Sequence, residues 1–293
     1  MKAGRPRIDR RAVFASAAAA ALLAAAGVGA GAAPHSGGRL RLALSGAARS
    51  DSFDPRRPAG VFMRVAALGA VFDTLTEVAA DGTLRPELAL GWQANADASV
   101  WEFTLRRDAV FHNGAGFGAA DAVASILLHG PESGLNLAGV QALDPYRIKI
   151  TLTAGNPDLP FVLSAPRFVM LPHRQTAQAM TQGVGTGLYK VARFHPGGHL
   201  LAERVSGHYK DGRAGWFDEL ELVSITAPQV RTEALLGEYV DAVDQPASHH
   251  ALGLLPAPPG MAQAVSARIA CQAQIGTSSL MDNYRAPERW WFA

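Results

Sequence analysis

The chain has 293 residues, of which 48% are hydrophobic and 18% are charged, and it contains one cysteine and no heptad pattern or short-period repeat. This composition is typical of a globular protein with enough residues for one large domain or two small ones, and it excludes an internal disulfide and a coiled coil. The formal net charge of +2 is too small to indicate a nucleic-acid-binding protein.

Residues 1–33 have the features of an export signal. A basic segment precedes an apolar run from Ala12 to Ala26, and small residues end the run at an A-x-A cleavage site near Ala32. The apolar run is shorter than the roughly 20 residues that cross a bilayer as a helix. The pair Arg10-Arg11 leaves two routes open, twin-arginine export and ordinary secretion. By either route, the expected location of the mature chain is the periplasm.

Charge supports treating this segment separately. Residues 1–33 hold five of the 27 basic residues and one of the 25 acidic ones, so the remainder holds 22 and 24, a net charge of −2. The basic isoelectric point therefore belongs largely to the signal, and no nucleic-acid partner is expected. The single cysteine, Cys271, lies far from the cleavage site, so the protein is not expected to be a lipoprotein.

Hydrophobic patterning predicts three elements in the first part of the mature chain. Leu40 to Leu44 alternates apolar and polar residues, which predicts a strand. Val65 to Leu75 is mainly apolar and is a helix candidate. Leu75 to Val78 and the segment from Leu84 onward flank Asp81-Gly82, a pair that tolerates the positive φ of tight turns, so we expect a hairpin.

The later part of the chain continues this mixture. Trp101 to Arg106 and Tyr146 to Leu152 alternate with the period of half-buried strands. A helix is expected from Gly118 to about Leu128, with Asp121 at its first turn, and another from Pro228 to Tyr239. Strands with interspersed helices and hairpins predict a mixed α/β, or α+β, fold. Two irregular segments complete the prediction: a turn at Asn113-Gly114 and a proline-rich linker or loop at Pro246–Gly260.

Catalytic and metal-binding signatures are weak. The sequence has no Gly-x-Ser-x-Gly elbow, no His-Glu-x-x-His and no phosphate loop. Gly185-Thr186-Gly187 is expected to be a turn that enters a strand from Tyr189 to Phe194, and His112 is expected to be exposed or to pack at its hairpin turn. His249-His250 stands in the proline-rich segment, where solvated side chains are more common than a metal site. We therefore expect that the protein is not an enzyme and that it binds no cofactor and no metal ion.

About ten short blocks, spread over roughly residues 38 to 245, carry a family resemblance. The blocks are Ser52-Phe53-Asp54-Pro55, Phe72-Asp73-Thr74-Leu75, Asp81 to Ala89, Gly91-Trp92, Trp101 to Arg106, Phe111 to Gly114, Ala120 to Val123, Gly185 to Tyr189, His208-Tyr209, Phe217 to Leu220, and Arg231 with Ala234 to Asp241. In this order and spacing they resemble the extracytoplasmic solute-binding proteins of family 5, which serve peptide and nickel ABC importers.

The resemblance implies two lobes joined by a hinge, with ligand engulfed between them and a small subdomain inserted in the first lobe. Here lobe I is expected at residues 38–68 and 155–244, and the inserted subdomain at residues 69–154. Members of the family continue into a second lobe. Residues 245–293 are expected to form a proline-rich linker and a short tail in its place, so lobe II is expected to be reduced or absent.

The function implied is that of a periplasmic solute-binding component of an ABC importer. It would capture a small solute, such as a peptide or a metal chelate, for a membrane permease, as a monomer and without catalysis. The candidate ligand-binding residues in lobe I are Phe62 and Met63, near the exit of the first strand, and Arg167. The guanidinium of Arg167 is suited to a bidentate pair with a ligand carboxylate, and equally to a surface salt bridge.

A second hypothesis stays open. A truncated accessory lobe would bind a protein partner in the periplasm, without transport, through its exposed cleft and the Trp290-Trp291 tail. The aromatic residues at 290–292 are suited to contact a ligand or a partner, and equally to dock into the protein's own core.

Overall fold

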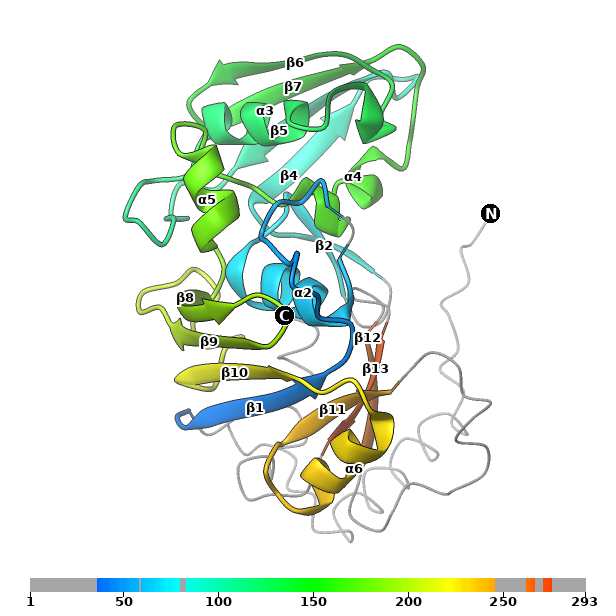
Figure 1. The fold of residues 1–293 in the computed structure, drawn as a ribbon. Helices are drawn as coiled ribbons and strands as arrows, with labels where there is room; N and C mark the ends of the chain where they lie inside the picture. The colour runs from blue at the N-terminus through cyan, green and yellow to red at the C-terminus, as the bar shows by residue number, and fades with distance from the viewer. Residues whose placement is uncertain (1–35, 58, 80–82, 246–261, 267–270, 276–293) are drawn as a thin grey trace, which may run out of the picture. The chain divides into compact units, whose positions relative to one another are not determined.

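A seven-stranded sheet brings together segments from both ends of the described chain. The computed structural model describes residues 36–57, 59–79, 83–245, 262–266 and 271–275, all within one compact unit, Ser36–Ala293. The strand order in this sheet is β12-β13-β11-β1-β10-β9-β8 (Figure 1). The strands are β1 (Arg39–Leu44), β8 (Tyr189–His195), β9 (His199–Arg204), β10 (Glu219–Ser224), β11 (Ala242–Gln245), β12 (Ala262–Ser266) and β13 (Cys271–Ile275).

Strand β1 lies inside the sheet and runs parallel to both of its neighbours, β10 and β11, which come much later in the chain (Figure 1). The strand predicted at residues 40–44 is confirmed, and its leucines are buried. The carboxylate of Asp241 accepts a hydrogen bond from the backbone N–H of Arg41 at 2.8 Å, and that of Asp244 accepts one from Ser45 at 3.0 Å. Two acidic residues around β11 therefore fasten this strand to β1.

A four-stranded antiparallel sheet, in the order β4-β5-β7-β6, forms separately, and β2 and β3 form a two-stranded sheet. The strands predicted at 101–106 and 146–152 are confirmed as β5 and β7, with the alternate apolar side chains buried. The predicted hairpin around Asp81-Gly82 is confirmed by the antiparallel pairing of β2 with β3. The strands are β2 (Thr76–Val78), β3 (Leu84–Pro86), β4 (Ala89–Ala94), β5 (Val100–Leu105), β6 (Leu137–Asp144) and β7 (Arg147–Leu152).

The apolar helix predicted from Val65 to Leu75 is present, but it begins and ends earlier than predicted. It starts as α2 (Val61–Arg64) and continues as a π-helix, η1 (Val65–Val71). Phe72 is already extended, with φ −122° and ψ 153°. The chain leaves the helix here because Asp73, the next residue, is held in a buried ion cluster. Asp73 stands in the predicted helix, but the sequence does not show that it pairs with the distant Lys210.

The other predicted helices are confirmed with small changes of boundary. Helix α3 (Ala119–Leu127) begins as predicted, because the Asp121 carboxylate accepts a backbone N–H from Gly118 at 2.9 Å. Helix α6 (Pro228–Leu236) ends before Tyr239, because Glu238 takes a left-handed conformation with φ 57°. The remaining helical segments are η2 (Gly130–Ser133), α4 (Leu159–Val162), η3 (Pro166–Phe168) and α5 (Thr176–Gln182).

Two main apolar cores form, one for each larger sheet, and the predicted mixed α/β fold is confirmed. Residues Ala70 to Phe72 pack in the core of the seven-stranded sheet, whereas Leu159, Leu163 and Phe168 pack in the core of the four-stranded sheet. The division into lobe I (38–68 and 155–244) and an inserted subdomain (69–154) remains a prediction. In the region predicted as linker and tail, β12 and β13 join the larger sheet. The export signal, His249-His250 and the Trp290-Trp291 tail lie outside the described residues.

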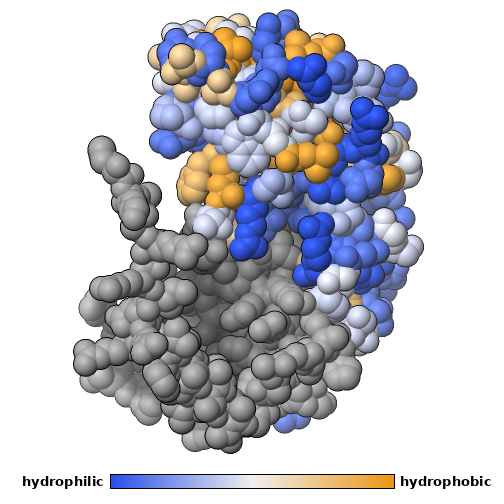
Figure 2. Space-filling view, turned by 180° about the vertical axis from the view of Figure 1, so that it is seen from behind, coloured by the Kyte–Doolittle hydropathy of each residue, from blue (hydrophilic) through white to orange (hydrophobic). Residues whose placement is uncertain are grey.

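The described surface is mixed in polarity. On the face shown in Figure 2, apolar side chains form separate patches among mainly hydrophilic ones. Within the described ranges, none of the helices has both the length and the apolar character needed to cross a membrane.

Candidate functional site

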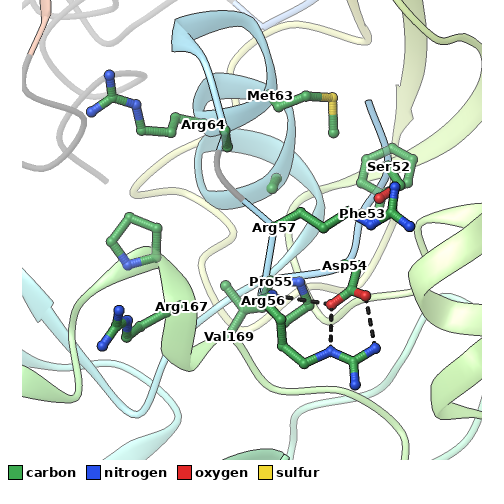
Figure 3. A pocket seen from close by; sticks show the side chains of 13 residues that line it. Ser52, Phe53, Asp54, Pro55, Arg56, Arg57, Met63, Arg64, Arg167 and Val169 are labelled. Atoms are coloured by element: carbon green, nitrogen blue, oxygen red, sulfur yellow. Dashed lines mark hydrogen bonds and ion pairs between the residues drawn. The ribbon is translucent and has the colours of Figure 1, made fainter. Parts of the chain in front are cut away.

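A pocket of about 300 Å³ lies where the loop after β1 meets η3 and the first turns of α2 and η1. Figure 3 shows it from close by. Its volume is at the lower end of the roughly 300–1,000 Å³ usual for small-molecule sites. The lining residues are Ser52, Phe53, Asp54, Pro55, Arg56, Arg57, Ala59, Met63, Arg64, Ala67, Pro166, Arg167 and Val169.

The loop side of the pocket is anchored by an aromatic residue. Phe53 is buried, and its ring lies 4.8 Å from that of Phe194 and 6.0 Å from that of Phe72, measured between ring centres. Its backbone N–H donates to the carbonyl of Met180 at 3.1 Å. Because Phe53 is fixed in the core, the residues that follow it are presented at the pocket.

The helical side is positioned by the exit of β1. The backbone N–H of Phe62 donates to the carbonyl of Ser45 at 3.1 Å, so α2 begins directly beside the end of the strand. Gly60 passes so close to Gly46 that a Cβ at Gly60 would lie 1.9 Å from the Gly46 carbonyl oxygen. On the opposite side, the guanidinium of Arg167 donates to the carbonyl of Ser133 at 3.1 Å.

Four arginines and one acidic residue line the pocket. The carboxylate of Asp54 accepts two hydrogen bonds from the Arg56 side chain, at 2.7 and 2.9 Å, and these contacts lower the pKa of Asp54, with a smaller contribution from Arg57. His129 binds the Arg167 carbonyl, and its pKa is lowered by burial first and then by the charges of Arg167 and Arg56. Positive charge therefore predominates at the pocket.

Two of the three predicted ligand-binding residues meet at this pocket. Met63 and Arg167 both line it, although 104 positions in the sequence separate them. Phe62 is fully buried in the core and is not among the lining residues. The sequence analysis missed Arg56, Arg57 and Arg64. Arg56 and Arg57 could have been found from the sequence, because they stand as a pair directly after the Asp54-Pro55 turn.

The Gly185-Thr186-Gly187 block is a turn into β8, as predicted, and two histidines hold it. The Nε2 atom of His112 donates to the Gly187 carbonyl at 2.8 Å, and that of His208 donates to the Thr186 carbonyl at 2.7 Å. In both rings Nδ1 accepts a backbone N–H. This arrangement requires the neutral imidazole, and burial lowers the pKa of both histidines. The packing role expected for His112 is therefore observed.

The free energy of unfolding is expected to decrease as the pH falls from 7 to 5. Because the folded-state pKa of each histidine lies below the ordinary 6.5, the unfolded chain binds more protons in this range. Each histidine then lowers the free energy of unfolding by up to about 1.4 kcal/mol for every unit by which the pH falls. Urea unfolding at pH 5, 6, 7 and 8 should show a smaller pH dependence for His208→Gln. The matched variant of exposed His195, His195→Gln, should keep the original slope, and equal slopes in both variants would contradict the assignment.

A buried ion cluster lies next to this turn. The ammonium group of Lys210 is 2.8 Å from a carboxylate oxygen of Asp73 and 2.7 Å from one of Glu87, and all three side chains are buried. The hydroxyls of Thr186 and Thr74 donate to the same two carboxylates, at 3.0 and 2.7 Å. The cluster joins segments that are 123 and 137 positions apart. Its contacts are internal, which indicates a structural role.

No group of three or more histidine, cysteine, aspartate or glutamate side chains in the described ranges is arranged to hold a metal ion. The chemistry that the pocket does offer is a set of guanidinium donors beside apolar walls from Met63 and Val169. Such a surface recognises an oxygen-rich anion by charge-assisted hydrogen bonds.

Comparison with known families gives one match that covers more than half of the chain. The profile of bacterial extracellular solute-binding proteins, family 5 Middle, matches residues 83–257. The matched range includes Arg167, the two histidines at the glycine-rich turn and the buried ion cluster except Asp73.

Individual curated proteins match a shorter part of the chain than the family profile does. The HTH-type transcriptional regulator SgrR of Yersinia pestis is 31% identical over 129 residues, which cover 43% of this chain and 23% of that protein. The nickel-binding periplasmic protein of Escherichia coli K12 is 31% identical over 133 residues, 40% of this chain and 25% of that protein. The match thus spans about a quarter of each curated relative.

A solved structure extends the similarity over most of the fold. The binding protein AgaA from A. tumefaciens R10, in complex with agropinic acid, superposes with a TM-score of 0.66 at 27% identity. The superposition covers 73% of this chain and 45% of that protein.

Proposed function

The chain belongs to the bacterial extracellular solute-binding proteins of family 5, and from this membership we propose that it captures a small solute for an ABC permease. The solute would bind at the pocket between the β1 exit loop and η3. The observation that carries this proposal is the meeting of Met63 and Arg167 at one pocket. The similar proteins are named as binding nickel and agropinic acid, which supports a small ligand.

The role proposed is binding without catalysis, in the periplasm. Residues 1–32 would be removed by cleavage near Ala32 after export, and the mature protein would act as a monomer. Residues 38–68 and 155–244 would act as lobe I, with residues 69–154 as the inserted subdomain. Ligand would shift the protein toward the state that the permease recognises, by its higher affinity for that state.

Native mass spectrometry of protein purified from the periplasm tests this proposal. We expect a retained small molecule, and a rise in melting temperature when peptides, organic acids, sugars or nickel chelates that fit are added. Arg167→Gln should weaken that binding by about tenfold, the value of a charge-assisted hydrogen bond. A ligand-free monomer that shows no thermal shift with any of these solutes would contradict the proposal.

A second candidate is an accessory lobe that binds a protein partner without transport. It is favoured by one observation: a matching segment occurs in a protein named as a transcriptional regulator, so such segments are not confined to proteins named for transport. Neighbouring genes for two permease subunits and two ATPases would favour transport. A partner protein that co-purifies in place of a small molecule would favour the accessory role.

A further inference from the structure

The charge of the pocket constrains what it can bind. Four guanidinium groups and one carboxylate line it, so three positive charges are in excess. The carboxylate of Asp54 is committed to Arg56 by two hydrogen bonds. Figure 3 shows this pair folded together, while Arg64 and Arg167 extend toward the other side of the view. The excess charge therefore belongs to Arg57, Arg64 and Arg167.

Two polar atoms at the pocket have no hydrogen-bond partner among the described residues. They are the hydroxyl oxygen of Ser52 and the Nε atom of Arg64, and both are buried. A buried polar group without a partner is destabilising, and more so when it is charged. Both residues line the same pocket, so one bound molecule can supply acceptors to both.

The charge around Arg64 is a second reason to expect a bound molecule at this pocket. Among the described residues, no carboxylate forms an ion pair with Arg57, Arg64 or Arg167. Guanidinium groups held together without counter-charges repel one another, and a low-dielectric surface strengthens that repulsion. An arriving molecule relieves it only if it brings negative charge.

We propose that the solute is a small organic acid with two or more oxyanion groups. This inference rests on the proposed function, because it assumes that the pocket takes up a small molecule. One oxyanion group accepts hydrogen bonds from Arg64 or Arg167, and a second accepts them from Ser52 or Arg57, which Figure 3 draws on the other side of the view. Planar guanidinium donors match the oxygens of a carboxylate or phosphate in pairs. The apolar walls contributed by Met63, Ala67 and Val169 contact the carbon skeleton between the two groups.

Isothermal titration of the ligand-free full-length protein tests the inference. The probes are citrate, succinate and inorganic phosphate, with glucose as a neutral solute and a lysine-rich tripeptide as a cationic one. We expect binding of citrate or succinate that weakens as the salt concentration rises. Arg64→Gln should weaken it by about tenfold or more. Arg57→Gln changes an exposed side chain, so it should fold normally and weaken binding about two- to fivefold.

The matched control is Arg193→Gln, which removes an exposed arginine of β8 that does not line the pocket. It should leave the affinity for the acid unchanged. Binding of phosphate alone would assign the site to a phosphorylated solute, which keeps the oxyanion inference. Binding of glucose or the cationic tripeptide, unaffected by Arg64→Gln and Arg57→Gln, would overturn the inference and leave the proposed function intact. Failure to bind any probe, together with no retained small molecule, would overturn both.

Discussion

Replacing Lys210 with methionine is expected to lower the free energy of unfolding by about 3–5 kcal/mol. The Lys210 ammonium lies 2.8 Å from Asp73 and 2.7 Å from Glu87, and the side chains of both acids are almost fully buried. Removing the cation leaves two buried carboxylates without their shared counter-charge, and the apolar side chain that replaces it cannot solvate them. The loss of this pair should therefore exceed that of an exposed ion pair, which is about 0–1 kcal/mol.

Urea unfolding at pH 8 measures this effect. The matched control is Lys190→Met, which replaces an exposed lysine of β8 and should change the unfolding free energy by less than about 0.5 kcal/mol. Equal effects of the two substitutions would show that the buried cluster does not stabilise the fold.

Replacing Gly187 with alanine is expected to destabilise the protein by at least about 3 kcal/mol. A Cβ atom at Gly187 would lie 2.2 Å from the carbonyl oxygen of Ala70, and one at Gly185 would lie 2.0 Å from that of Val71. The obstacles are backbone atoms at the end of η1, which cannot move aside as a flexible side chain can. The backbone N–H of Gly187 also donates to Val71 at 2.8 Å.

Thermal and urea unfolding should show a large loss for Gly187→Ala and also for Gly185→Ala. The control is Gly91→Ala in β4, where a Cβ would meet nothing within 4 Å, and its effect should stay within about 0.5 kcal/mol. A Gly187→Ala variant as stable as the Gly91→Ala variant would contradict the close approach seen here.

The sequence was sufficient for elements whose pattern is local. Alternating apolar residues predicted β1, β5 and β7, and Asp121 and Pro228 marked the starts of α3 and α6. These signals work because a strand or helix that packs one face on a core repeats its apolar residues with its own period. The family predicted from the order of the short blocks is confirmed by the family match at residues 83–257.

Features that depend on distant segments could not be predicted in the same way. The helix predicted to reach Leu75 ends at Val71, because Asp73 pairs with Lys210, 137 positions away. The candidate pocket shows the same limit. Its arginines come from three separate segments, and only the folded chain shows that Arg64 and Arg167 share a cavity while Phe62 is buried in the core.

The position of β1 has a consequence for how the protein reaches its folded state. Its residues bond to partners 180 and 200 positions later in the chain, and those partners are its neighbours on both sides. A nascent chain therefore carries an unpaired β1 until β10 and β11 have been synthesised. Contacts of such long range make folding slow, because the loop must close before they form. During that interval the chain is a suitable substrate for holding factors that recognise extended apolar segments.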